Sequence, residues 1–491
     1  MARMPPRAHR SALAAALVVA GGAGLLPALA AAERTATPET PFGRRGDGTG
    51  RFDDATPVTE WSETKNVAWR AKMPARSISQ PVLAGEVLFT CAEPTTLLCL
   101  RRRDGTILWQ KSHDYVDLLP ADEQVRVRKE LLAAERVRKI ELEPVRRRLQ
   151  EVSRRLNGMP DDPFLRRQRD SLKRRRDAIE KKIAALARHR NPTGDPALGL
   201  SSCTPVTDGR GVFCLFGNGV GAVYDLAGSR TWARAIRRAK EPLGRSMSPV
   251  LAGRALVMSI DREILAVDAA TGKDLWTLAT YRPSAGLVGA KVGGRWVVAT
   301  AEGSVLRAAD GRLLARVGGA ARTPAAAPVI RKDVLYLLGS GPRLLVELLV
   351  PQGAGVRLDH FAGARVFRGS YYASPLYHGG CVYLWEKANV LSVVNVRTGE
   401  RLIAKKLRLG GSAYASPALG GRYVFLGSDN GTIAVLRPTP SRSASGKLRI
   451  ELTEVARNRL DPGRSAPVFA GNRMYVRTSQ YLYCIGPTGG G

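Results

Sequence analysis

The chain has 491 residues, with 76 lysines and arginines against 43 aspartates and glutamates, and a formal net charge of +33. This length indicates several domains or one large repeat array. Six scattered cysteines without a CxxC spacing exclude a disulfide-built scaffold and a cysteine zinc site. The charge favours an anionic partner, although a generally arginine-rich composition with no specific partner explains it equally well.

The first 32 residues have the pattern of a secretory signal peptide. Arg3, Arg7 and Arg10 precede an apolar run over 11–26, and the small residues that follow offer cleavage after Ala30 or Ala32. The alternative, a membrane anchor, needs roughly 20 apolar residues, which is more than this run supplies. We expect a soluble protein in the periplasm or outside the cell, without a transmembrane segment after cleavage. Residues 33–60 are then an extended linker, and export makes nucleic acid an unexpected partner.

A short phrase recurs along the rest of the chain: a small or polar residue, proline, apolar residues and a turn. Its prolines are Pro81, Pro205, Pro249, Pro328, Pro375, Pro417 and Pro467, and a degenerate copy without proline occupies residues 289–294. Each copy reads as four short strands between Gly, Asp or Asn turns. Eight such units, mostly spaced by about 40 to 50 residues, predict an all-β, eight-bladed β-propeller of four-stranded antiparallel blades.

The ends of the chain are predicted to close the ring. The last copy is one strand short, and residues 66–71, before the first copy, have the pattern of an outer strand. We therefore expect residues 61–120 to supply this closing strand and blade 1, and residues 191–491 to supply blades 2–8. The glycine-rich stretch 217–221 falls at a hairpin of blade 2 and is interpreted as a turn.

Residues 121–190 interrupt the β pattern with a predicted helical hairpin, a coiled-coil arm. Apolar residues recur at helical spacing over 142–156 and 165–186, and a Gly-Met-Pro break separates the two runs. Pro144 should kink the first helix or mark its restart. The segment carries 22 basic and 12 acidic residues, which a solvated helix face explains in part. We interpret the excess as a contact for a polyanion or a protein partner.

The turn and strand at residues 268–276, Asp-Ala-Ala-Thr-Gly-Lys-Asp-Leu-Trp, closely resemble the repeat of pyrroloquinoline quinone (PQQ) propellers. Shorter or looser versions end at Trp109 and Trp232, and the fourth to seventh copies lack the tryptophan. The resemblance implies that four tryptophans dock each blade on its neighbour and that three turn residues knit the blades together. The tryptophans are Trp69, Trp109, Trp232 and Trp276, and the turn residues are Asp268, Thr271 and Gly272.

The same repeat builds quinoprotein dehydrogenases and non-catalytic propellers of the BamB-like type. This chain is more similar to the second, because it has no adjacent cysteine pair, no recognisable calcium-ligand signature and no haem-attachment CxxCH. We therefore expect no catalytic residue, no metal ligand and no cofactor, with PQQ and calcium as the alternative. Disulfides remain compatible with export, and the spacings of Cys91 with Cys99 and of Cys203 with Cys214 suit neighbouring strands.

Residues that precede the repeated prolines enter the inner strands from the rim of the channel. Arginine and tyrosine are frequent interface anchors, and six of them form the candidate binding rim. They are Arg76, Arg245, Tyr371, Tyr372, Tyr414 and Arg464. The leading hypothesis is a monomeric, non-catalytic interaction or envelope-assembly scaffold that binds an envelope protein or an anionic polymer. The alternatives are a PQQ-dependent alcohol or sugar oxidoreductase and a polysaccharide-binding propeller.

Overall fold

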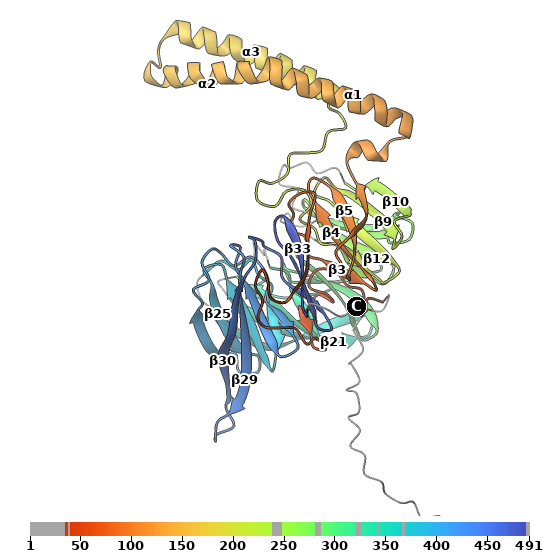
Figure 1. Ribbon diagram of the computed structural model, residues 1–491, viewed down its shortest axis with the longest axis vertical. Helices are drawn as coiled ribbons and strands as arrows, with labels where there is room; N and C mark the ends of the chain where they lie inside the picture. Colours follow the sequence, from red (N-terminus) through yellow and green to blue (C-terminus); the bar gives the residue numbers. More distant parts are fainter. Residues whose placement is uncertain are drawn as a thin grey trace, which may run out of the picture. The chain divides into compact units, whose positions relative to one another are not determined.

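The computed structural model describes residues 35–37, 40–237, 248–279, 286–320, 326–340, 343–365 and 369–487. Residues 1–32, the expected signal segment, lie outside this range. The strands form eight sheets, one per blade (Figure 1). Six are built from four consecutive antiparallel strands, one adds a fifth strand from the N-terminal region, and one combines three strands with a strand of that region. The predicted eight-bladed propeller with one helical insertion is confirmed.

The first four blades follow the chain in order. Blade 1 is β3 (Val82–Ala84), β4 (Val87–Ala92), β5 (Thr96–Arg101) and β6 (Ile107–Ser112). Blade 2 is β7 (Val206–Thr207), β8 (Gly211–Leu215), β9 (Val220–Asp225) and β10 (Arg230–Ala235). Blade 3 is β11 (Val250–Ala252), β12 (Ala255–Ile260), β13 (Glu263–Asp268) and β14 (Asp274–Ala279). Blade 4 is β15 (Leu287–Val292), β16 (Arg295–Thr300), β17 (Ser304–Arg307) and β18 (Leu313–Arg316).

The last four blades include two strands from the N-terminal region. Blade 5 is β19 (Val329–Arg331), β20 (Val334–Gly339), β21 (Arg343–Gln352) and β22 (Gly355–Arg365). Blade 6 is β23 (Leu376–His378), β24 (Cys381–Glu386), β25 (Val390–Asn395) and β26 (Arg401–Lys406). Blade 7 is β27 (Ala418–Gly420), β28 (Tyr423–Gly427), β29 (Thr432–Arg442) and β30 (Leu448–Arg459), with β1 (Arg51–Phe52) added in parallel to β27. Blade 8 is β31 (Val468–Ala470), β32 (Arg473–Arg477), β33 (Tyr481–Ile485) and β2 (Val67–Lys72).

Ring closure follows the sequence prediction. Strand β2 pairs antiparallel with β33, with Ala71 opposite Leu482 and Trp69 opposite Cys484. The pairing continues beyond the strand, because the Met73 amide donates to the Gln480 carbonyl at 2.8 Å. Blade 8 is therefore made from both ends of the propeller, with β2 as its outer strand.

The hydrophobic core lies between the blades. In one cluster, Tyr336 and Val346 of blade 5 pack against Val382 and Val394 of blade 6, and all four are almost fully buried. Burying a side chain of this size stabilises the fold by about 1.5–3 kcal/mol. Alternation along each strand sends side chains to both faces of a blade, so each blade contributes to two such interfaces.

The polar residue before the repeated proline has a role in this packing. Its hydroxyl accepts a hydrogen bond from the backbone amide at the matching position of the preceding blade. The bonds run from Gln80 to Thr204 (3.1 Å), from Thr204 to Ser248 (2.9 Å), from Ala327 to Ser374 (3.1 Å) and from Ser374 to Ser416 (2.9 Å). The following proline has no amide hydrogen to donate. The amide just before it therefore provides the hydrogen bond between neighbouring blades at this point.

The insertion begins with a short 3-10 helix (Tyr115–Leu118) and contains three longer helical segments. These are α1 (Ala121–Val137), a π-helix (Arg138–Leu142) that continues into α2 (Glu143–Gly158), and α3 (Pro163–Leu186). Pro144 lies in the first turn of α2, where its missing amide and its ring favour the wider π turn that precedes it. Asp162 caps α3 by accepting from the amides of Phe164 and Leu165. No described helix is long and apolar enough to cross a membrane.

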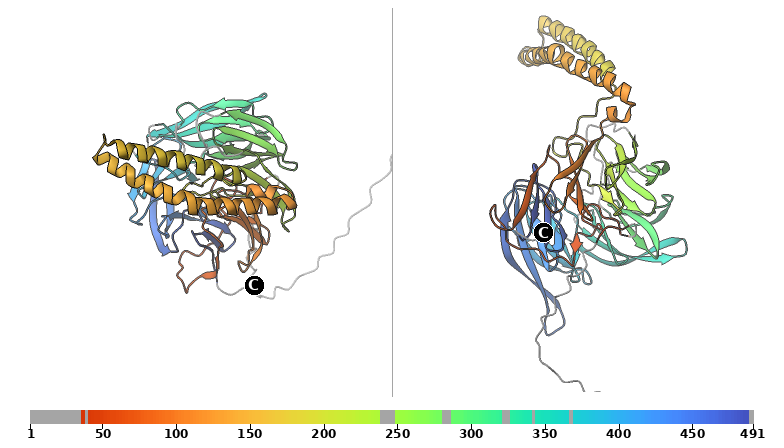
Figure 2. Two further views of the ribbon diagram at one scale, coloured as in Figure 1. Left: turned by 90° about the horizontal axis from the view of Figure 1, so that it is seen from above. Right: turned by 45° about the vertical axis from the view of Figure 1, so that its right-hand side comes forward.

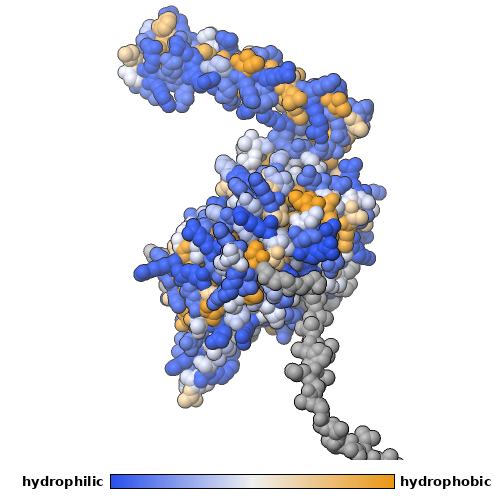
Figure 3. All heavy atoms as spheres, viewed as in Figure 1, coloured by the Kyte–Doolittle hydropathy of each residue, from blue (hydrophilic) through white to orange (hydrophobic). Residues whose placement is uncertain are grey.

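Helices α2 and α3 lie side by side as a hairpin (Figure 2), and the whole helical insertion, residues 121–190, is called the arm below. Near its tip, Val152, Leu156 and Leu165 form one buried cluster, and Leu165 is only 1% exposed. A second cluster joins Val145 of α2 to Ile179 of α3. The predicted apolar positions therefore face one another, while the visible outer surface of the arm is mainly hydrophilic (Figure 3).

The sequence leaves open whether the cysteines form disulfides, and the structure shows none among them. All six are free and buried. Cys91 and Cys99 lie on paired strands but out of register, since Cys91 faces Leu97 and Cys99 faces Phe89. Cys203 and Cys214 are not bonded to each other either. Burial raises the pKa of Cys91 and Cys99 to about 12, so these thiols are held protonated and inert at neutral pH.

Candidate functional site

A segment near the N-terminus lies among the inner strands of the propeller. Phe42 pairs with Thr207 of blade 2, and the Arg45 amide donates to the Gln80 side chain beside blade 1 at 2.8 Å. Further on, Arg51 donates to the Tyr377 carbonyl of blade 6 at 2.7 Å, and β1 pairs with blade 7. This stretch, residues 40–57, was predicted as part of a linker. It instead contacts the blades around the axis and is called the channel segment below.

The channel segment and the inner strands enclose a cavity of about 1210 Å³. Its wall includes Tyr371, Tyr372, Tyr414 and Arg464 of the predicted rim, together with Asp195, Ala197 and Leu198, which follow the arm. The chain that returns from the arm and the channel mouth therefore line one cavity.

The structure brings only part of the predicted rim together. Rings of Tyr372 and Tyr414 lie 5.2 Å apart, and the Arg464 guanidinium stands 4.3 Å from the Tyr414 ring centre. Lys387 approaches both rings at 5.8 and 5.9 Å, a residue that the sequence pattern did not single out. Arg76 instead donates to the Pro196 carbonyl, away from this group. Arg245 lies outside the described residues.

Tyr371 differs from its two neighbours. Its hydroxyl is buried and has no hydrogen-bond partner among the described residues, and burial raises its pKa to about 12. Tyr372 is 39% exposed and presents its ring at the surface. Exposed aromatic rings beside cations are typical of interface anchors, so Tyr372, Tyr414, Lys387 and Arg464 form the part of the rim that is best arranged for contact.

The four predicted docking tryptophans share one geometry. Each indole Nε1 donates to a backbone carbonyl in the outer turn of the next blade, and each ring covers a glycine of that turn. The bonds run from Trp69 to Arg102 (3.0 Å), from Trp109 to Leu226 (3.1 Å), from Trp232 to Ala269 (2.9 Å) and from Trp276 to Ala308 (2.9 Å). The covered glycines are Gly105, Gly228, Gly272 and Gly311, all with positive φ. A side chain at any of them would meet the indole ring.

The turn of blade 3 shows why the repeat has its residue pattern. The Asp268 carboxylate accepts from both the amide and the hydroxyl of Thr271 at 2.9 Å, which closes the turn. Gly272 then adopts φ +71°, and a Cβ there would lie 2.7 Å from Trp232. In blade 6, which lacks an outer tryptophan, Trp385 of β24 is fully buried and donates to the Gly427 carbonyl of blade 7.

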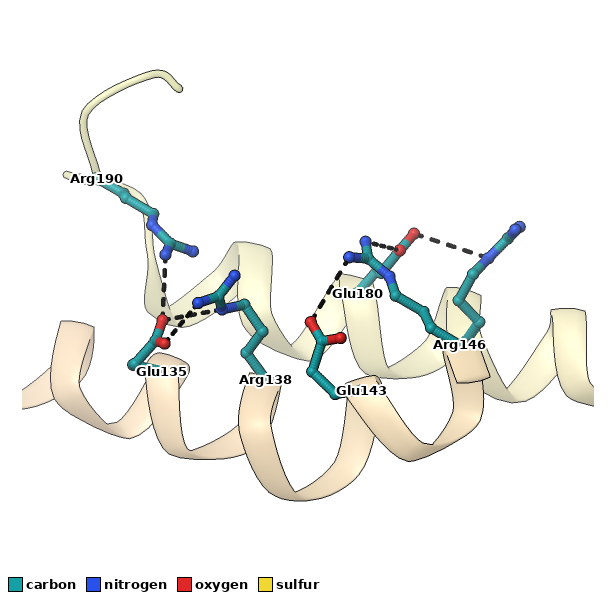
Figure 4. Close-up of polar contacts among 7 residues, drawn as sticks. Glu135, Arg138, Glu143, Arg146, Glu180 and Arg190 are labelled. Atoms are coloured by element: carbon teal, nitrogen blue, oxygen red, sulfur yellow. Dashed lines mark hydrogen bonds and ion pairs between the residues drawn. The ribbon is translucent and has the colours of Figure 1, made fainter. Parts of the chain in front are cut away.

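Most acidic side chains of the arm are engaged by nearby arginines or lysines. Figure 4 shows Glu135 between Arg138 and Arg190, and Glu180 beside Arg146. Towards the tip, each carboxylate between residues 147 and 177 is also engaged. Glu151, Asp161, Asp170 and Asp177 pair with Arg148, Arg166, Arg169 and Arg176, and Asp162 caps α3.

Seven exposed cations in this part of the arm form no ion pair among the described residues, although Lys173 and Arg174 lie close enough to Asp170 to help lower its pKa. Together the seven are called the distal cation cluster. They are Arg147, Arg154, Arg155, Arg167, Lys173, Arg174 and Arg175. Like charges at this density repel one another, so the arm has a net positive potential that only an external anion can neutralise.

The root of the arm is held by a residue that the sequence reading assigned only to a turn. Asn218 of blade 2 is fully buried, and its amide donates to the His113 carbonyl at 2.8 Å and to Asn191 at 3.0 Å. Its backbone carbonyl accepts from the Tyr115 hydroxyl. Asn218 thus links the outgoing and returning chains of the arm to the propeller. This role can be recognised only in the folded structure, because the contacts come from distant parts of the sequence.

His113, at this root, makes the stability dependent on pH. It is 1% exposed, stacks on Phe216, and is held by Thr95 and Tyr224 at 3.0 Å each. Burial lowers its pKa from 6.5 to about 4. Between these values the unfolded chain binds a proton that the folded chain does not. His113 therefore leaves the free energy of unfolding undiminished above about pH 6.5 and lowers it progressively as the pH drops toward 4.

We expect this histidine to cost about 2 kcal/mol of unfolding free energy between pH 7 and pH 5, at about 1.4 kcal/mol per pKa unit. Urea unfolding at the two pH values measures the loss, and His113→Gln is the comparison because it keeps a polar side chain that does not titrate. An equal loss in H113Q would show that other groups cause the pH dependence.

The cavity does not fit PQQ with a calcium ion, the cofactor pair of the enzyme alternative. Calcium needs six to eight oxygen ligands. The cavity carboxylates are already engaged, since Asp47 accepts from Thr49, Asp53 pairs with Arg51, and Asp195 accepts from two amides. Nowhere in the described part of the chain do three acidic, histidine or cysteine side chains converge as a metal site.

A protein-family model described as outer membrane protein assembly factor BamB matches residues 49–148 and 217–446. Among solved structures, BamB from Moraxella catarrhalis has 13% identity and a TM-score of 0.51, over 86% of this chain and 97% of its own. The computationally designed Ika8 protein has 11% identity and a TM-score of 0.52, over 86% and 100%. Quinohemoprotein alcohol dehydrogenase from Comamonas testosteroni has 9% identity and a TM-score of 0.51, over 93% and 82%. Identities this low show a shared fold alone. No curated protein sequence matches the chain.

Proposed function

The chain belongs to the family described as outer membrane protein assembly factor BamB, and from this premise we propose that it is a non-catalytic scaffold of the cell envelope. Its basic arm captures an acidic protein or an anionic polymer, and the propeller holds the arm and the aromatic rim at one cavity. The exported location stays a prediction that rests on residues 1–32.

The observation that carries this proposal is the distal cation cluster. Its seven cations are exposed, and the carboxylates around them are engaged by other residues. A solvated helical hairpin does not require such an excess, whereas a polyanionic partner neutralises it and releases counterions. The aromatic rim supplies a second contact for the same partner, because it lines the cavity that the returning chain of the arm also lines.

Deletion of the arm tests the proposal. Residues 121–190 are replaced by a short Gly-Ser linker between Pro120 and Asn191, and the mature protein is compared with the deletion variant. Circular dichroism checks that the propeller stays folded. We expect the intact protein to bind immobilised polyglutamate or heparin with an affinity that falls as salt rises, and the variant to lose this binding. Retained binding by a folded variant would place the contact elsewhere and contradict the proposal.

A PQQ-dependent oxidoreductase is the second candidate, favoured only by the fold shared with the Comamonas enzyme. Thermal unfolding with and without PQQ and calcium separates the two functions. A ligand at about 100 times its dissociation constant stabilises the native state by about 2.7 kcal/mol, which is a visible rise of the midpoint. A rise that requires both additions would favour the enzyme, and an unchanged midpoint would favour the scaffold.

A further inference from the structure

One charged side chain inside the propeller lacks the partners that its burial demands. Arg45, in the channel segment, is only 3% exposed. Its Nη2 donates to the Pro417 carbonyl of blade 7 at 3.1 Å, but its Nε and Nη1 have no partner among the described residues. A buried guanidinium with most of its donors unpaired is costly, and native proteins rarely leave one so.

A second buried arginine in the propeller shows the usual solution. Arg477 is 1% exposed, and its two terminal nitrogens donate to carbonyls of Thr478, Ser479 and Ala75 at 2.5 to 3.1 Å. Protein oxygens thus satisfy most of this guanidinium, and its role is structural. Arg45 has one such carbonyl, so the contrast indicates that acceptors come to it from outside the chain.

The neighbouring residue strengthens the case. Arg44 lines the same cavity, and its one hydrogen bond among the described residues is a long one, 3.4 Å, to the Ser374 hydroxyl. Neither arginine has an ion-pair partner in the described part of the chain. Burial and the adjacent Arg44 lower the pKa of Arg45 to about 9, against a smaller opposing effect of Asp47. Two neighbouring like charges, one buried and one partly buried, favour binding of an anion close to both.

The loop at Gly50 packs closely against the Arg45 guanidinium. Gly50 has φ +74°, and a Cβ there would lie 2.4 Å from Nη2 and 2.8 Å from Nε. The Gly50 amide also donates to the Arg45 carbonyl at 3.1 Å, which closes a tight loop around the side chain. The positive φ favours glycine at position 50, and any other side chain there would also displace the guanidinium from its place against this loop.

We propose that the central cavity binds a small oxyanion, a carboxylate or a phosphate, between Arg44 and Arg45. The planar donors of a guanidinium match the oxygens of both groups, and two adjacent guanidinium groups hold one tetrahedral or planar anion from two sides. Both arginines line the cavity of about 1210 Å³, whose wall also carries Arg51, Arg331 and Arg464. The site is independent of the arm and of the function proposed for it.

Isothermal titration calorimetry of the mature protein with inorganic phosphate and, separately, with citrate tests the site at constant ionic strength in chloride. We expect saturable one-to-one binding of at least one of the two. Arg45→Met should weaken it at least tenfold, and Arg44→Met should weaken it severalfold. Arg103→Met is the matched control, because this arginine is 76% exposed on an outer turn of blade 1, and it should leave binding unchanged.

The variants also report on folding. R45M removes a buried charge, so its unfolding midpoint in chloride should equal or exceed that of the parent protein. If R45M does not fold, Arg45→Lys keeps the charge without the planar donors and should weaken binding severalfold. Binding of phosphate alone or of citrate alone identifies the source of the oxyanion. Binding of neither, or binding that the Arg45 variants leave unchanged, overturns the proposal.

Discussion

Replacing Trp109 with alanine is expected to lower the free energy of unfolding by about 3–4 kcal/mol. The ring packs, tilted, between those of Phe89 and Tyr224, with centroids 5.7 and 5.8 Å away, and so joins blade 1 to blade 2. Its indole nitrogen donates to the Leu226 carbonyl at 3.1 Å, and the ring covers Gly228. The substitution removes aromatic packing, a hydrogen bond and buried surface at one interface.

Chemical denaturation followed by far-UV circular dichroism measures the loss. Trp109→Phe is the matched control, since it keeps an aromatic ring and loses the indole donor, and should cost about 1 kcal/mol from the hydrogen bond plus a smaller packing loss. A W109A variant as stable as the parent would mean that the outer turn contributes nothing to blade docking.

Neutralising four members of the distal cation cluster is expected to lower the affinity for polyglutamate or heparin by about 30-fold. The variant replaces Arg147, Arg154, Arg174 and Arg175 with glutamine. Each exposed charge contributes about 0.5 kcal/mol to a contact with an anion, so four contribute about 2 kcal/mol, and about 1.4 kcal/mol is tenfold in affinity. Binding measured over a range of salt concentrations should also show a shallower salt dependence.

A variant with the same change in net charge elsewhere is the control. It replaces four exposed arginines of blade 7 with glutamine, namely Arg422, Arg437, Arg442 and Arg449. We expect it to bind almost as the parent does, because the screened field of these residues acts only over about 8–10 Å. Equal losses in both variants would mean that overall charge, rather than the arm, drives binding.

The sequence alone predicts the features that repetition or periodicity encodes. Eight copies of one phrase predict eight blades, and the outer-strand pattern around Trp69 predicts its pairing beside Cys484. The helical spacing of Val145, Val152 and Leu156 likewise predicts the buried side of α2. In each case the local spacing of apolar residues indicates which face of the element is buried, and the fold buries that face.

Other features depend on contacts that no local pattern records. The channel segment has no strand periodicity, and its contacts are mostly with backbone groups of blades far along the chain, such as Pro417. Asn218 sits in an ordinary turn, and only the packed blade shows that its side chain holds the arm. The cysteine spacings suit paired strands, but two sulfur atoms meet only if the strand register places their residues opposite each other. The register of β4 and β5 does not place Cys91 opposite Cys99.

The closure of the ring by β2 also sets the order in which the protein can be completed. The side chain of Arg477 in blade 8 donates to the Ala75 carbonyl, across 402 residues of chain. Such distant pairings pay a large loop-closure entropy and form late in folding. During synthesis, β2 and the channel segment emerge first and wait without partners until the last blade is made. The closed ring therefore exists only in the finished protein.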